Sequence, residues 1–179
     1  MTDVARFEAF VREYQDMVFA TAVRLLGRES EAEDVAQTVF LRAFERFAEV
    51  VSSPSAAGWL KTVATNLCLN HLSRYRARWQ FFSELDRGPE EGPSFASRLA
   101  IVASAPDDVE RAERHAHLEL ALRRLPDHQR VPLVLFHFEE MSYQSIADAL
   151  DVSVAKVKTD IHRGREALRQ ELSAFHGSR

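Results

Sequence analysis

The stretch MSYQSIADALDVSVAKVKTDIHRGREALRQEL, residues 141–172, decides the fold because it predicts two helices joined by a turn too short to be a linker. Ser142 is expected to cap a first helix over Tyr143–Leu150. A two-residue bend follows, and Ser153 is expected to cap a second helix that begins at Val154. Two capped helices around so short a bend indicate a helix-turn-helix.

The second helix of this pair has two faces of different chemistry. Its apolar stripe, expected to pack inward, consists of Val154, Val157, Ile161, Gly164 and Leu168. The rest of the surface carries small, hydrogen-bonding and cationic side chains, namely Ala155, Lys156, Lys158, Thr159, His162, Arg163, Arg165 and Arg169. This arrangement is typical of a recognition helix, whose first turns contact base edges while Lys and Arg neutralise phosphates. The alternative is an ordinary helical hairpin with a solvated basic face.

The composition limits what the whole chain can be. Its 179 residues suffice for one domain or two small ones, and 46% apolar residues can fill a core. A net charge of −4 requires any DNA contact to come from local patches. The single cysteine, Cys68, excludes an internal disulfide and fits a reducing compartment. Without an apolar run of about 18 residues or a signal-peptide pattern, the chain is expected to be cytoplasmic, with no insertion into a membrane.

The N-terminal part predicts two helices. Apolar residues keep helical spacing over residues 7–25, and Gly27 stands where that first helix would end. Its aromatic stripe is expected to lie in the core. Ser30 and Glu33 form a capping-box pattern, which predicts a second helix over residues 31–48.

An apolar residue stands on the outer side of this second helix. Leu41 lies opposite the inward stripe at helical spacing, on a patch made of Asp34, Gln37, Leu41 and Phe44. The helix is either covered on both sides or uses this patch to dock on another protein. The residues by themselves leave both interpretations open.

An acid-free basic segment follows. Residues 49–57 predict a loop around Pro54, and residues 58–78 predict a helix. Residues 50–83 contain four cations and no carboxylate, a local charge of +4 in a negative chain. The side chains expected to face solvent or a ligand are Lys61, Thr62, Thr65, Asn66, Asn70 and Arg74. Amides, cations and neighbouring aromatic rings favour binding of single-stranded nucleic acid, with a solvated basic face as the alternative.

The remaining segments define the domain organisation. Residues 81–106 predict an acidic, flexible linker rich in Gly, Pro and Ser, and residues 84–114 hold eight Asp or Glu against four Arg. Asp107 is expected to cap a helix that ends at Leu125, and a core helix interrupted mildly by Pro132 follows. The chain after Leu172 is expected to fray. The sequence thus predicts an all-α protein with two small helical domains, residues 1–80 and 107–179, the second a four-helix domain.

Catalytic chemistry is not expected. Cys68 and His71 form a CxxH pair, but no second metal-spaced pair accompanies them, which favours a buried thiol over a zinc site. No phosphate loop, zinc motif or nucleophile–base cluster is present in the sequence. We therefore expect no enzyme activity, no catalytic residue, no metal and no cofactor.

Three blocks together resemble the extracytoplasmic-function (ECF) sigma factors of bacterial RNA polymerase, over nearly the whole chain. The blocks are ESEAEDVAQTVFLRAF from Glu29, GWLKTVATNLCLNHLSR from Gly58, and LPDHQRVPLVLFHFEEMSYQSIADALDVSVAKVKTDIHRGREAL from Leu125. The resemblance implies two domains that bind core RNA polymerase and together recognise the −10 and −35 elements of promoter DNA. It also implies an anti-sigma factor as a further partner, and a linker lying in the channel later used by RNA.

The resemblance implies roles for particular residues. The polymerase clamp would bind the outer patch, Asp34, Gln37, Leu41 and Phe44. The loop at residues 50–57 and the following helix would receive an extruded base of the −10 element, with Lys61, Asn66, Asn70 and Arg74 as its contacts. The −35 duplex would be contacted by Lys156, Lys158, Thr159, His162, Arg163 and Arg165. Thr62 departs from family members that have an arginine there, so the −10 preference does not transfer. In the −35 helix, Asp160 departs from the basic or small residue usual in the family.

Two rival functions differ from this one in their predictions. A stand-alone helix-turn-helix regulator would bind duplex DNA tightly without polymerase and with dimer symmetry. A helical adaptor without any nucleic-acid role would tolerate charge reversals at Lys158 and Arg163. The acid-free segment at residues 50–83 favours the sigma factor over both.

Overall fold

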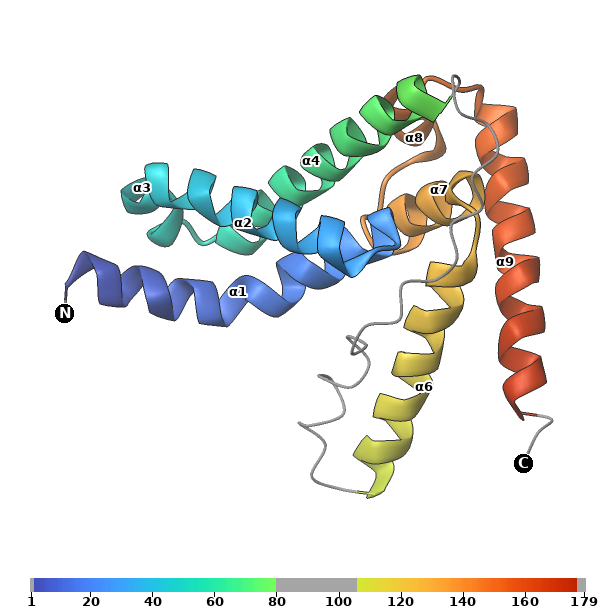
Figure 1. The fold of residues 1–179 in the computed structure, drawn as a ribbon, viewed down its shortest axis with the longest axis horizontal. Helices are drawn as coiled ribbons and strands as arrows, with labels where there is room; N and C mark the ends of the chain where they lie inside the picture. Colours follow the sequence, from blue (N-terminus) through green and yellow to red (C-terminus); the bar gives the residue numbers. More distant parts are fainter. Residues whose placement is uncertain (1, 80–105, 177–179) are drawn as a thin grey trace. The chain divides into compact units, whose positions relative to one another are not determined.

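The computed structural model describes residues 2–79 and 106–176, where all regular secondary structure is helical (Figure 1). The predicted all-α fold is confirmed. The chain divides into two compact units, Met1–Leu85 and Asp86–Arg179. The predicted linker, residues 81–106, lies outside the described residues except for Pro106, where a helix begins.

The first unit contains α1 (Asp3–Leu26), α2 (Glu29–Glu45), α3 (Phe47–Val51) and α4 (Ala56–Trp79). Figure 1 shows α1, α2 and α4 packed together, with α3 where the chain turns from α2 towards α4. Thr2 caps α1, since its Oγ1 accepts a hydrogen bond from the Ala5 amide at 3.3 Å. Gly27 ends α1 with a left-handed φ of 74°, as its position in the sequence predicts.

Small and aliphatic side chains form the core of this unit. The buried alanines include Ala22, Ala32, Ala43 and Ala64, each 0% exposed, which lets the three long helices approach one another closely. Leu25, Val39 and Leu60 fill the space between them and are also 0% exposed. Cys68 is 0% exposed as well, so the predicted buried thiol is confirmed.

The predicted bounds of α2 are wrong at both ends. The helix begins at Glu29 after an extended Arg28 that makes no side-chain cap, so Ser30 lies inside the first turn and not at the predicted N-cap position. Glu29 and Glu31 instead place negative charge at the helix N-terminus. The helix stops at Arg46, and the expected loop shortens to residues 52–55 because α3 occupies residues 47–51.

A tertiary contact explains this break. The Phe47 ring lies against two aromatic rings of α1, 5.3 Å from Phe7 and 5.9 Å from Phe10 between centroids. Edge-to-face pairs of this kind stabilise by roughly 0.5–1.5 kcal/mol beyond the burial of their area. The chain therefore turns after α2 to place Phe47 on α1, which helical spacing alone does not reveal.

The second unit contains α6 (Pro106–Arg124), α7 (Asp127–His137), α8 (Tyr143–Leu150) and α9 (Val154–His176). The first helix begins at Pro106 rather than after Asp107, as suits a residue that lacks an amide hydrogen. The predicted fraying after Leu172 is wrong, because α9 continues to His176. An exposed ion pair, 3.1 Å long, links Arg124 of α6 to Glu171 near this end of α9.

The core of the second unit lies where its four helices meet. Its fully buried side chains come from every helix and include Leu122, Val131, Leu135, Ile146, Val157 and Ile161. Pro132 lies inside α7 without ending it, as predicted. The core also contains a charged residue, Arg130, whose exposed fraction is 3%. Its guanidinium donates hydrogen bonds to the Leu125 carbonyl at 2.9 Å and to the Asp127 carboxylate at 2.6 Å. It fixes the turn between α6 and α7.

Candidate nucleic-acid interface

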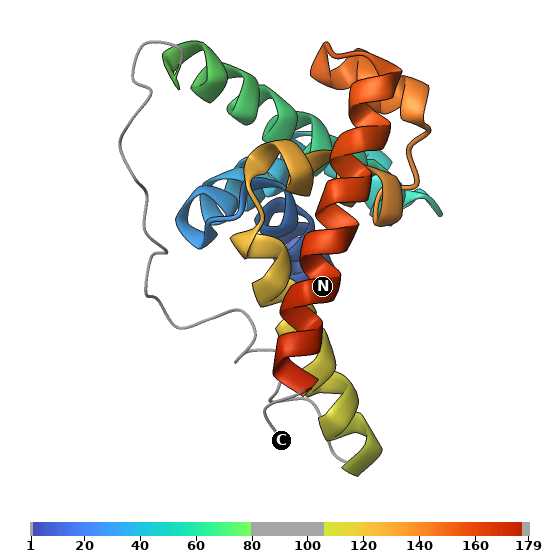
Figure 2. The ribbon, with the colours of Figure 1, turned by 90° about the vertical axis from the view of Figure 1, so that its right-hand side faces the viewer.

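The helix-turn-helix has the predicted bounds and caps. Ser142 Oγ accepts a hydrogen bond from the Ser145 amide at 3.1 Å, and Ser153 Oγ accepts one from the Lys156 amide at 3.1 Å. Between the two helices Asp151 takes a left-handed φ of 53°, a conformation that Asp tolerates better than most residues. Figure 2 shows α8 beside the first turns of α9.

The two faces of α9 follow the predicted division in its first turns, while Val154 and Leu168 of the predicted inward stripe are only half-buried. Val157 and Ile161 are buried against the rest of the unit. Gly164 also faces inward, and a Cβ there would lie 3.0 Å from Leu133 Cδ1 and 3.2 Å from the Gln129 carbonyl oxygen. Glycine therefore permits the close approach of α7 and α9. Of the side chains predicted to face outward, Arg165 is half-buried. The others are exposed, namely Ala155, Lys156, Lys158, Thr159, His162, Arg163 and Arg169.

Two of these exposed side chains are already engaged within the helix. Lys156 Nζ lies 2.6 Å from Oδ2 of Asp160, whose side chain is 7% exposed. Because the partner is buried, this pair holds the ammonium group more firmly than a surface pair would. Thr159 Oγ1 donates to the Ala155 carbonyl at 3.0 Å and therefore offers a ligand an acceptor rather than a donor.

A cluster of aromatic and cationic side chains lies where α7, α8 and α9 meet. The rings of Phe136 and Tyr143 stack at 4.8 Å between centroids. Arg165 lies over the Phe136 ring at 5.6 Å, and Lys158 lies over the Tyr143 ring at 5.7 Å. Arg165 Nε also donates a 3.1 Å hydrogen bond to Nε2 of His137. Desolvation and the charge of Arg165 lower the pKa of His137 below its ordinary value.

The α4 face of the first unit carries neutral amides. Asn66 and Asn70 are exposed one helical turn apart, and Lys61 is half-buried. Arg74 continues this spacing within α4, but its side chain is outside the described set. The expectation that Thr65 faces outward is wrong, because it is 8% exposed beside the buried Ala64 and Cys68.

The outer patch of α2 is exposed. Leu41 is 65% exposed and Phe44 is 55% exposed, and both Asp34 and Gln37 face solvent on the same helix. The Phe44 ring meets the Phe7 ring edge-on at 4.9 Å, which fixes its direction. Among the described residues, therefore, no other helix covers Leu41, and the interpretation that α2 is covered on both sides is not supported.

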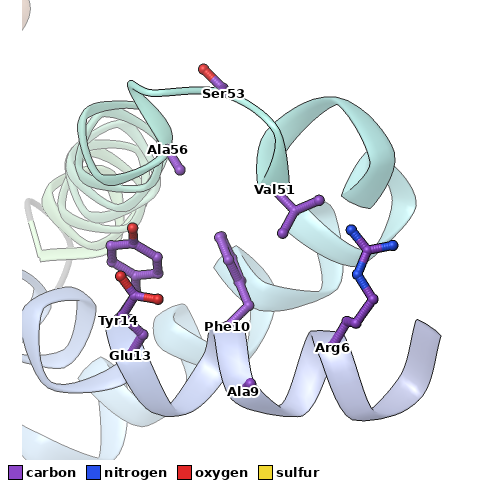
Figure 3. Close-up of a pocket in the computed structure, with 8 residues that line it drawn as sticks. All are labelled: Arg6, Ala9, Phe10, Glu13, Tyr14, Val51, Ser53 and Ala56. Carbon is purple, nitrogen blue, oxygen red and sulfur yellow. The ribbon is translucent and has the colours of Figure 1, made fainter. Parts of the chain in front are cut away.

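A pocket of about 260 Å³ lies between α1 and the short α3–α4 loop. In Figure 3 the rings of Phe10 and Tyr14 rise from α1 towards that loop. Its lining residues are Arg6, Ala9, Phe10, Glu13, Tyr14, Val51, Ser53 and Ala56. A hydrogen bond with Glu13 raises the pKa of the Tyr14 hydroxyl. The sequence did not predict this pocket, because the spacing of the aromatic residues in α1 indicated only that they pack in the core.

Residues 2–79 and 106–176 contain no group of three or more His, Cys, Asp or Glu side chains placed to hold a metal ion. The same residues include no helix with the length and apolar character that crossing a membrane requires.

The second unit presents a helix-turn-helix with an exposed cationic face, and the first unit presents exposed amides on α4. This combination is typical of a two-part helical DNA-binding protein. The comparisons with known proteins specify the class further. Residues 10–78 match the family model for Sigma-70 region 2, and residues 115–168 match that for Sigma-70, region 4.

Individual relatives agree with the family models. The chain is 32% identical to the ECF RNA polymerase sigma factor SigW of Bacillus subtilis over 171 residues, 95% of this chain and 90% of that protein. It is 35% identical to the ECF RNA polymerase sigma factor SigE of Mycolicibacterium smegmatis over 175 residues, 96% of this chain and 63% of that protein. The chain belongs to the ECF family of RNA polymerase sigma factors.

A solved structure shows a related fold. The sigma factor RpoE of Bartonella quintana, crystallised with the anti-sigma factor NepR, matches with a TM-score of 0.54 and 18% identity. The match covers 94% of this chain and 97% of that chain.

Proposed function

We propose that this sigma factor binds core RNA polymerase, directs it to promoters through a −10 and a −35 element, and promotes melting of the DNA. The observation that carries the proposal is the pair of exposed faces, amides on α4 in one unit and cations on α9 in the other. It acts without catalytic residues, metal or cofactor of its own, since the chemistry of RNA synthesis belongs to polymerase. Its place of action is the cytoplasm, where polymerase and promoter meet.

The −35 element is assigned to the second unit. Helix α9 would enter the major groove with its N-terminal turns, where Lys158, Thr159 and His162 are exposed. Arg163 is exposed on the same face and suits bidentate contact with guanine or with a phosphate. Arg165 would hold a phosphate from the edge of the groove. Lys156 contributes less, because Asp160 already neutralises its charge.

The −10 element is assigned to the first unit. Asn66 and Asn70 would hydrogen-bond bases of the melted strand, and Lys61 and Arg74 would hold its backbone. The pocket beside residues 52–55 would receive one extruded base, because Phe10 and Tyr14 offer it aromatic walls. Capture of unstacked bases offsets the few kcal/mol that each unstacked base costs.

Two protein partners follow from the family. Core polymerase would bind the outer patch of α2, made of Asp34, Gln37, Leu41 and Phe44, where exposed apolar surface is flanked by polar groups. An anti-sigma factor is the second partner, as in the complex of the Bartonella quintana sigma factor with NepR.

Run-off transcription with purified core polymerase and a promoter library tests this function. We expect the chain to redirect core enzyme to a discrete set of start sites that share two spaced elements. A protein that binds core enzyme but selects no start site would refute the proposal. Tight binding to duplex operators without polymerase would instead support the stand-alone regulator, which the matches to both sigma regions do not favour.

A further inference from the structure

A side-chain hydrogen bond joins α9 to α7, and the proposed DNA contacts do not account for it. Arg165 Nε donates to His137 Nε2 across 3.1 Å, although the two residues are 28 positions apart in the sequence. A guanidinium has donors and no acceptor, so the imidazole must present an unprotonated Nε2 and carry its proton on Nδ1. The bond therefore fixes both the tautomer of His137 and the direction of Arg165.

The aromatic rings restrict the guanidinium further. Arg165 lies 5.6 Å from the centroid of Phe136, and Phe136 is held by its stack with Tyr143, whose planes differ by 15°. A cation over an aromatic face is attracted by the ring quadrupole. With Nε bonded to His137 and the planar group over Phe136, the terminal nitrogens of Arg165 remain for a ligand.

We propose that His137 is a positioning residue, which holds Arg165 through its Nε2 so that the guanidinium is already directed at a −35 phosphate before DNA binds. This inference rests on the proposed contact between Arg165 and the −35 duplex. A free arginine loses rotamer entropy when it binds a phosphate. An arginine held in advance by His137 and Phe136 loses less, and the affinity for DNA increases accordingly.

The electrostatics of the site agree with this role. The charged and titratable side chains that join His137 in this cluster are Arg165 and Lys158 on α9 and Tyr143 at the start of α8, and Glu139 and Glu140 follow α7 in the chain. Of these, the positive charge of Arg165 lowers the pKa of His137, after desolvation as the larger cause. The neutral imidazole that accepts the hydrogen bond is thus the favoured form at pH 7.

A double-mutant cycle on the full chain bound to core polymerase tests the proposal. The probe is a promoter duplex selected by run-off transcription, and the measurement is the Kd of the closed complex. We expect His137→Leu to weaken binding by about three- to tenfold, and His137→Gln, which keeps an acceptor, to stay within about twofold of wild type. In an Arg165→Ala background, His137→Leu should have no further effect. His128→Leu, at an exposed position in the first turn of α7, is the matched control.

Each other outcome has a distinct meaning. Additive losses in the double variant would show that His137 contacts DNA itself and would overturn the positioning role. Equal losses for His137→Leu and His137→Gln would overturn it too, provided that circular dichroism shows both variants folded. If Arg165→Ala alone leaves the Kd unchanged, the proposed function of Arg165 is wrong and the inference falls with it.

NMR titration of the free protein tests the contact without DNA. We expect the pKa of His137 to lie below the ordinary histidine value of about 6.5 and to rise towards it in Arg165→Ala, because a nearby positive charge is removed. A pKa of His137 that is ordinary and does not change in that variant would show that the hydrogen bond is not formed in solution.

Discussion

The exposed faces of α4 and α9 present different chemistry to DNA. Helix α4 exposes the neutral amides Asn66 and Asn70, whereas α9 exposes Lys158, His162 and Arg163. Amides exchange hydrogen bonds with unpaired base edges, while cations neutralise the phosphates of a duplex. We propose that this difference reflects a division of labour, in which the second unit holds double-stranded DNA and the first unit captures bases after they separate.

The largest expected effect is on polymerase binding, through the α2 patch that we propose as the contact of the first unit with polymerase. Leu41→Glu places a carboxylate where the apolar side chain is 65% exposed. We expect the Kd for core polymerase to rise by roughly 30-fold or more, because a residue central to an interface contributes about 2 kcal/mol or more. Binding of labelled protein to core enzyme measures this effect.

The matched control for Leu41 is Val4→Glu, since Val4 is similarly exposed at 62% but lies on α1. We expect it to bind core polymerase normally. If the two variants lost equal affinity, the effect of Leu41→Glu would reflect general surface charge, and the docking role of the patch would be refuted.

The second prediction tests the proposed contact between the second unit and duplex DNA. Arg163→Ala should weaken the closed promoter complex by about 1–3 kcal/mol, because a base or phosphate contact from α9 is lost. A gel-shift titration with the polymerase complex measures it, with Arg111→Ala as the control, since that arginine is 79% exposed on α6. Unchanged affinity in Arg163→Ala would remove α9 from the −35 interface.

The third prediction tests the proposed contact between the first unit and the melted strand. Asn66→Ala should slow promoter opening by roughly fivefold, which corresponds to about 1 kcal/mol for one hydrogen bond made in the open complex. The closed complex should keep its affinity. Stopped-flow fluorescence of a promoter labelled in the −10 element follows the opening, and Gln15→Ala, an exposed amide on α1, is the control.

The smallest effect separates two neighbouring lysines of α9. Lys158→Ala should reduce the slope of log K for DNA binding against log salt concentration by about 1, the value for one lost phosphate contact. Lys156→Ala should lower it less, because its ammonium lies 2.6 Å from Asp160. Equal slopes for the two variants, measured between low and physiological salt, would show that DNA competes successfully with Asp160.

Much of the second unit was predictable because its signals are local. Ser142, Ser153 and the bend between α8 and α9 each act within a few residues, and the structure confirms all three. The exposed face of α9 followed from helical spacing for the same reason. The pair of Lys156 and Asp160 was also within reach, since opposite charges four positions apart lie on one helix face.

The errors and omissions have a common physical origin in contacts between distant residues. Helix α2 breaks because Phe47 packs on α1, and Thr65 is buried by the neighbours of α4. The contact between His137 and Arg165 spans 28 positions, and the pocket beside α1 joins residues 6–14 to residues 51–56. Periodicity within one helix carries no information on such partners.

If the two faces act at different steps of initiation, variants of each face should change DNA binding and DNA melting separately. Permanganate reactivity of the −10 thymines, measured against closed-complex occupancy on the same promoter, tests this directly. We predict that Asn66→Ala lowers reactivity per bound complex, whereas Arg163→Ala lowers occupancy and leaves reactivity per bound complex unchanged. Equal reductions of both quantities in both variants would contradict the division of labour.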